Sequence, residues 1–100
     1  MSEKFKDEFV PSIRDWCEEN SDRVSKCYAS MHQGYPSIFV IGSAEPNGRD
    51  ELGERLADLG QHLKRRGWQC NLVQIPRKDY AHYDAFLAAE EAVVVFEEKQ

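Results

Sequence analysis

Residues 37–67 read SIFVIGSAEPNGRDELGERLADLGQHLKRRG, and this stretch decides the fold class. It opens with an apolar run at 38–41, which stops at Gly42 and is followed by turn-forming residues. The spacing of four leucines then predicts an amphipathic helix: Leu52, Leu56, Leu59 and Leu63. The basic residues 64–66 complement the negative end of the helix dipole, and Gly67 is a natural helix terminator. The stretch therefore indicates a strand–loop–helix unit of an α/β protein.

The remaining segments extend this pattern on both sides. Residues 68–75 and 92–96 are predicted as a second and a third strand, with a short helix between them that begins after Asp79. Upstream, Gly34 and Pro36 are expected to end an N-terminal helical segment, either one long helix or two short ones. Its apolar residues follow one helical stripe: Phe9, Ile13, Trp16, Cys17, Val24, Cys27, Tyr28 and Met31.

Strands that alternate with helices favour a parallel sheet with right-handed crossovers. We therefore expect a small three-layer αβα sandwich, with a three-stranded, mainly parallel sheet of order 2-1-3 after the N-terminal helical segment. The expected organisation is a flexible N-terminus at 1–8, a single α/β domain at 9–97 and a polar tail at 98–100.

Composition narrows the class of protein. The net charge of −5 disfavours a nucleic-acid binder or a protein of anionic membrane surfaces, since both need a basic surface. Three cysteines without C-x-x-C spacing favour reduced thiols in the cytoplasm over a disulfide framework. The charged first eight residues do not resemble a signal peptide, and the wholly apolar stretch at 92–96 is too short to cross a membrane.

Topology gives the main expectation for a ligand site. In a parallel sheet of order 2-1-3, ligands favour the crevice at the carboxyl ends of the strands, where the strand order reverses. The loops after the first and second strands meet there, and they would bring together five polar side chains: Ser43, Asn47, Arg49, Arg77 and Lys78. These groups suit a phosphate or carboxylate. The alternative is a surface turn, because Glu45 and Asp50 would repel an anion unless they point away.

No motif in the sequence indicates a reaction. The loop from Gly42 to Asp50 is one residue too long for a Walker loop and carries Arg49 where that motif needs Lys. Neither a Ser-His-Asp arrangement nor a metal-ligand spacing of His and Cys is found, so we expect no catalytic residues, no metal and no cofactor.

The segment from Phe39 to Val73 resembles the opening of the Rossmann-like domain of DNA-processing protein A and of the lysine-decarboxylase-like cytokinin-activating proteins. The resemblance lies in residues 40–43, where a strand ends in Gly-Ser, and in residues 66–68, where Arg-Gly precedes the next strand. It covers about a third of the chain. The later glycine-rich and acidic motifs of those families are missing, so the resemblance implies a βαβ unit and no activity.

Two functions remain open at this point. The first is a small non-enzymatic interaction or regulatory domain, which binds a protein partner or a second copy of itself. It would act through the strand at 68–75, expected at the sheet edge, or through the acidic face of the N-terminal segment. The second is an anion- or nucleotide-binding domain that uses the two loops named above.

Overall fold

The computed structural model describes residues 5–32, 35–42 and 51–98 of the chain. A helical turn, η1 (Phe5–Phe9), leads into the first helix. The further helices and strands follow in this order: α1 (Val10–Glu19), β1 (Val24–His32), β2 (Tyr35–Gly42), α2 (Glu51–Arg65), β3 (Asn71–Ile75), the short helix η2 (Arg77–Asp79), α3 (Tyr80–Ala89) and β4 (Val93–Glu97).

The sheet has four strands in the order β3-β2-β1-β4. Strand β1 is antiparallel to both of its neighbours, β2 and β4, whereas β2 and β3 are parallel. The predicted three-stranded, mainly parallel sheet of order 2-1-3 is therefore wrong. Its error is the N-terminal segment, where residues 24–32 form a central strand between β2 and β4 and not a helix.

The local sequence explains why the pattern of residues 24–32 is typical of a helix although the segment forms β1. Its side chains alternate between the two faces, but helices cover both faces, so β1 shows no polar–apolar alternation. The register also shifts between Val24 and Lys26, which breaks the two-residue period. The remaining apolar residues at 24, 27, 28 and 31 happen to match a helical spacing.

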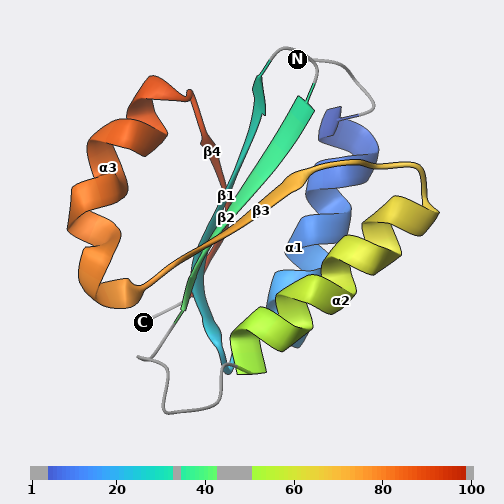
Figure 1. Cartoon of the computed structure of the whole chain (residues 1–100), viewed down its shortest axis with the longest axis horizontal. Coiled ribbons are helices and arrows are strands. Elements are labelled where there is room, and N and C mark those ends of the chain that lie inside the picture. Colours follow the sequence, from blue (N-terminus) through green and yellow to red (C-terminus); the bar gives the residue numbers. More distant parts are fainter. Residues whose placement is uncertain (1–4, 33–34, 43–50, 99–100) are drawn as a thin grey trace.

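The molecule has three layers, with α1 and α2 on one face of the sheet and α3 on the other (Figure 1). The larger core lies between the first two helices and the sheet, and it includes the four predicted leucines of α2, all of them buried. The smaller core lies under α3 and contains five buried residues: Tyr28, Phe39, Ile41, Ile75 and Leu87. Helix α3 buries only Leu87, so most of its surface is exposed.

Helix α2 ends as the sequence predicts and packs closely on β3. Gly67 has a positive φ of 89°, and the Trp68 N–H donates to the Leu63 carbonyl at 2.9 Å, which closes the last turn of the helix. At Gly60, an added Cβ would lie 2.7 Å from Cδ1 of Leu72 in β3. A glycine costs stability within a helix, but at this position it allows the close approach of α2 and β3.

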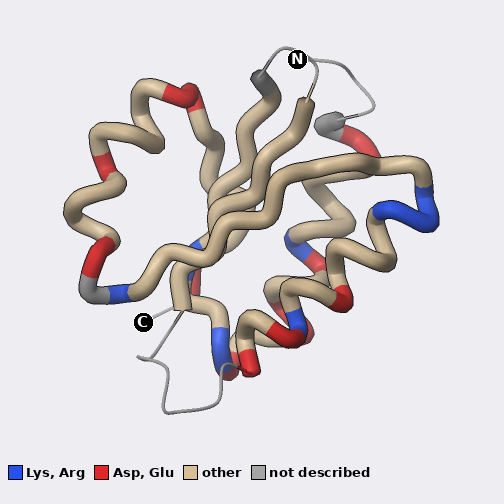
Figure 2. The backbone as a smooth tube through the Cα atoms, in the orientation of Figure 1, with Lys and Arg blue, Asp and Glu red and all other residues tan. Residues whose placement is uncertain are grey.

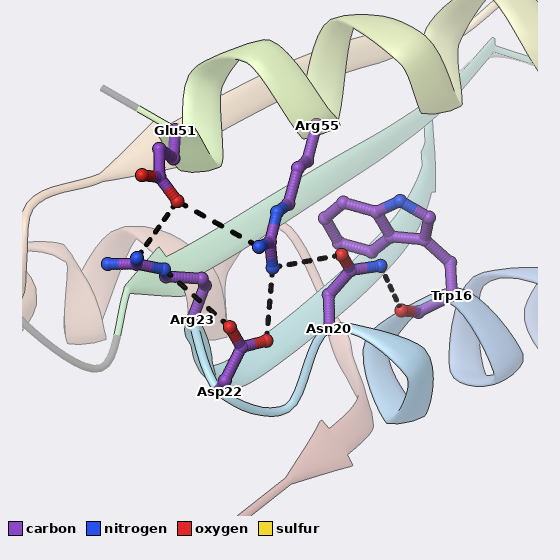
Figure 3. Close-up of polar contacts among 6 residues, drawn as sticks. All are labelled: Trp16, Asn20, Asp22, Arg23, Glu51 and Arg55. Atoms are coloured by element: carbon purple, nitrogen blue, oxygen red, sulfur yellow. Dashed lines mark hydrogen bonds and ion pairs between the residues drawn. The ribbon is translucent and has the colours of Figure 1, made fainter. Parts of the chain in front are cut away.

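A polar network fixes the start of α2 against the turn between α1 and β1 (Figure 3). Arg55 donates to Asn20 at 3.2 Å and to Asp22 at 3.0 Å, and Arg23 pairs with Glu51 at 2.8 Å. The hydrogen bond from Arg55 holds the pKa of Asp22 below its usual value. These side chains are largely exposed, and each arginine pairs with a carboxylate of the network. We therefore assign the network the role of positioning α2.

Candidate functional site

Most of the predicted anion site falls outside the described residues. Ser43, Asn47 and Arg49 belong to residues 43–50, and the side chain of Lys78 is likewise not described. Arg77 is exposed at the start of η2, and the carboxyl ends of β2 and β3 do meet at one edge of the sheet, because these strands are parallel neighbours. The five-residue site therefore stays a prediction.

The place where the crevice was expected, between the first and third predicted strands, is occupied by another strand. Strand β1 lies between β2 and β4 and brings Lys26 and Tyr28 under the start of α3, where they meet Tyr80. The two tyrosine hydroxyls are 2.6 Å apart, and Lys26 Nζ lies 3.1 Å from the Tyr80 hydroxyl and 5.1 Å from the centre of the Tyr28 ring. Glu97 Oε1 is 3.9 Å from the same ammonium.

This Lys26–Tyr28–Tyr80 cluster connects α3 to the sheet. Hydrogen bonds to Tyr28 and Tyr80 raise the pKa of Lys26 above its usual value, so its ammonium stays charged at physiological pH. Burial raises the pKa of Tyr28, which keeps that phenol protonated. Each polar end has a partner within the cluster, as a buried polar group requires. The cluster is not evident from the sequence, because the expected helix over this segment would separate Lys26 from Tyr28.

Strand β3 forms an open edge of the sheet. Among the described residues, no strand pairs with its outer side, and Figure 1 looks directly onto it, with α2 and α3 on either side. Its sequence, Asn-Leu-Val-Gln-Ile, contains no proline and no charged residue, and the absence of charge is visible in Figure 2. Natural edge strands are commonly blocked by charges, proline or a bulge, so β3 retains the capacity to pair with another strand.

The opposite edge, β4, is protected by a bulge and by a side chain that uses one of its main-chain acceptors. A register shift against β1 leaves Val95 as an extra residue, a bulge that interrupts regular pairing. Arg14 of α1 also donates through Nε to the Val95 carbonyl at 3.3 Å, so this main-chain acceptor is already used. The two edges of the sheet therefore differ in their readiness to accept a strand.

An open groove of about 530 Å³ lies between α3 and the sheet beside β3. We call it the aromatic groove; it is lined by Tyr35, Ser37 and Phe39 of β2, residues 71–73 of β3, and Phe86 and Glu90 of α3 and its end. Phe39 and Phe86 meet edge to face, with ring centres 5.7 Å apart. Tyr35 and Phe86 remain 43% and 45% exposed, unusual for large aromatic side chains and typical of contact surfaces.

A second hollow, of about 250 Å³, lies on the other face of the sheet next to the start of β3. We call it the tryptophan hollow; its lining includes Lys64 of α2 together with Trp68 and Cys70. Tyr35 lines both hollows. An added strand points successive side chains to opposite faces of a sheet, so these two hollows are placed to receive alternate side chains.

A polar row crosses the sheet at the same end. Ser30, Ser37 and Asn71 are partners in register across three strands, and Asn71 Nδ2 lies 3.4 Å from the Ser37 hydroxyl. The Ser30 hydroxyl is buried, and none of the described residues hydrogen-bonds to it. A buried hydroxyl without a partner is a cost to the fold.

This cost gives a prediction of unusual sign. Replacing Ser30 with Ala is expected to raise the free energy of unfolding by about 1 kcal/mol, because the desolvated hydroxyl is removed and little volume is lost. Ser37→Ala is the matched control, and it should leave stability unchanged or lower it slightly. Urea denaturation measures both variants, and a destabilised Ser30→Ala would show that the hydroxyl makes a favourable contact.

Other chemistry finds no support in the part of the chain that the structure describes. No group of three or more His, Cys, Asp and Glu side chains there is arranged to hold a metal ion. Cys17 and Cys27 are buried in the larger core, and a hydrogen bond with Cys17 together with burial raises the pKa of Cys27, so this thiol is poorly suited to act as a nucleophile. Within the same residues, no helix has both the length and the apolar character needed to span a bilayer.

The comparisons with known proteins add no relative. The resemblance to Rossmann-like openings therefore rests on the parallel unit β2–α2–β3 alone. No protein-family model, no curated protein and no solved structure matches this chain.

Proposed function

We propose that the protein is a small interaction domain that binds an extended segment of a protein partner along β3. The observation that carries this proposal is the contrast between the edges: β3 is uncharged and no strand of the described residues pairs with its outer side, whereas β4 has a bulge and is capped by Arg14. Main-chain hydrogen bonds to such an edge supply affinity, and hollows for alternate side chains supply specificity.

The shape of the surroundings supports the same mode of binding. The aromatic groove and the tryptophan hollow lie on opposite faces of the sheet at the same end of β3. Exposed aromatic rings give a contact surface at a low cost in conformational entropy. The groove and the hollow share Tyr35 in their lining, and both lie near the start of β3, where a chain in the extended conformation would add.

A selection from random octapeptides displayed on phage tests the proposal without knowledge of the natural partner. We expect the selected peptides, added to isotope-labelled protein, to shift the amide resonances of Asn71–Ile75 and of Tyr35 and Phe86. N-methylation of alternate peptide amides should abolish binding, because strand addition uses those N–H groups. Peptides that shift only α1 or α2 resonances, or that tolerate every N-methyl group, would contradict strand addition.

A second copy of the chain is the competing occupant of the edge. Antiparallel pairing of β3 with itself would give a symmetric dimer. Analytical ultracentrifugation of the peptide-free protein separates the two cases. We expect a monomer at micromolar concentration; a dimer that dissociates when a selected peptide is added would assign the edge to self-association.

The anion-binding function remains a second proposal, supported by the parallel neighbours β2 and β3, whose carboxyl ends lie at one edge of the sheet. Lys26 adds a further cation near this edge, because it contacts the hydroxyl of Tyr80, and Tyr80 follows Arg77 by three residues. Titration with inorganic phosphate and with ATP should then shift the resonances of the loops at 43–50 and 76–79. Unmoved loop resonances at millimolar ligand would end this proposal.

A further inference from the structure

The charges around the aromatic groove are one-sided. Its lining contains one acidic residue, Glu90, and neither Lys nor Arg. In the part of the chain that the structure describes, Glu90 takes part in no ion pair. Three aromatic rings, of Tyr35, Phe39 and Phe86, line the same groove.

Helix α3 adds to this negative potential. Glu90 caps its C-terminal end and Glu91 follows, and the last turn contains no basic residue. The carbonyl end of a helix carries a partial negative charge, so carboxylates at this end are locally unfavourable. The carboxylate of Glu90 gains no stabilisation from the helix dipole at this end, whereas a cation bound in the groove would be attracted by both the carboxylate and the helix end.

We infer that the aromatic groove binds a cationic side chain, Arg or Lys, of the strand that pairs with β3. This inference rests on the proposed function and specifies the chemistry of the partner. A guanidinium or ammonium group over aromatic faces gains cation–π attraction, and Arg can also stack on the rings and pair with Glu90. The net charge of −5 favours the approach of a basic segment over long range.

The tryptophan hollow disfavours a base at the positions of the bound strand that neighbour the cationic residue. A residue adjacent to the bound base points to the other face of the sheet, where Lys64 lies beside Trp68. A second base there would meet a like charge, which disfavours binding. The recognised segment therefore carries one base flanked by apolar residues, not a basic run.

The same argument disfavours a second copy as the occupant. Strand β3 itself contains no Lys or Arg, so the paired residues Asn71–Ile75 of a second copy would offer no cation to Glu90. Two chains of charge −5 would also repel one another. The groove is thus complementary to a basic segment of a different protein.

The experiment compares matched peptides and matched variants by isothermal titration calorimetry. From the octapeptide selection described above, the tightest binder is resynthesised with citrulline in place of Arg, or with norleucine in place of Lys. We expect this uncharged analogue to bind about tenfold more weakly, the order of one cation–π contact combined with one partly exposed ion pair. Glu90→Gln removes the ion pair and keeps the aromatic rings, so it should weaken the basic peptide by a smaller factor of about three and leave the uncharged analogue unchanged.

Two further variants exclude a general loss of structure. Glu91→Gln removes the neighbouring carboxylate, which does not line the groove, and should leave affinity unchanged. Phe86→Leu should weaken the basic peptide more than its uncharged analogue. Glu90→Gln should also leave the melting temperature unchanged or raise it, because a charge is removed from the unfavourable helix end.

The possible results separate the two proposals. If selected peptides shift β3 resonances but contain no enriched base, or tolerate the uncharged analogue and Glu90→Gln, the inference about the cation is overturned and strand addition stands. If no selected peptide shifts β3 resonances, both are overturned. If Glu90→Gln and Glu91→Gln weaken peptide binding equally, the peptide is attracted by the overall negative charge and not by Glu90 in the groove. This result would also overturn the inference.

Discussion

Replacing Ala29 with Asp is expected to lower the free energy of unfolding by at least about 4 kcal/mol, because the substitution buries a carboxylate at the centre of the sheet. Ala29 is fully buried in β1, between Ile38 of β2 and Val93 of β4. A domain of this size is stable by roughly 5–15 kcal/mol, so most of its stability would be lost.

The Ala29 substitution also discriminates between the structure and the helix that the sequence suggested. A helix over this segment would place Ala29 away from its apolar stripe at 24, 27, 28 and 31, where an acidic side chain is harmless. Urea denaturation followed by the fluorescence of the half-buried Trp16 and Trp68 measures the loss.

Ala57→Asp is the matched control, since Ala57 is exposed on α2. Its expected cost is below about 1 kcal/mol, which is the difference in helix propensity between Ala and Asp. Equal, small effects at Ala29 and Ala57 would contradict the position of β1 in the sheet.

Asn71→Lys is expected to weaken binding of the selected basic peptides by about thirtyfold or more, equivalent to roughly 2 kcal/mol. Asn71 is exposed at the start of β3 and lines the aromatic groove, so its replacement places a cation beside the bound base. A lysine on an edge strand also opposes pairing with a further strand. Since Asn71 is exposed, the variant should fold normally.

Val94→Lys provides the matched control at the other edge of the sheet. Val94 is 49% exposed on β4, so it accepts a lysine as readily as Asn71 does. Peptide affinity, measured by calorimetry, should be unchanged in this variant. A loss in Val94→Lys but not in Asn71→Lys would move the binding edge from β3 to β4.

The sequence was informative where one signal dominated. The leucine spacing of α2 and the terminator Gly67 predicted that helix, and both features are found in the structure. The parallel pairing of β2 with β3, and the edge position of β3, also followed from the apolar run at 38–41 and the mixed pattern of the next strand. These elements are defined by local patterns and a single crossover.

The N-terminal half of the sheet was not predictable by the same reasoning. Strand β1 is covered on both faces and contains a register shift, so its apolar residues lost the two-residue period. One signal was available: only residues 33–34, Gln-Gly, separate the segment at 24–32 from the next strand, which suits a tight hairpin. This hairpin signal conflicts with the prediction that Gly34 ends a helix.

The candidate site depends on contacts between distant segments. Tyr35, Phe86 and Glu90 are far apart in sequence, and they line one groove because α3 crosses the face of the sheet from β3 to β4. No motif connects them. A helix with exposed apolar residues and an uncompensated acidic C-terminal end was the remaining signal in α3.

Amide hydrogen exchange at β3 tests the central claim most directly. With saturating selected octapeptide, we expect exchange of alternate amides within Asn71–Ile75 to slow by at least about tenfold, because outward N–H groups gain partners, while amides of Val93–Glu97 exchange as before. Unchanged exchange across Asn71–Ile75 in the bound protein would contradict the account, since a peptide held without new main-chain hydrogen bonds has not been added to the sheet.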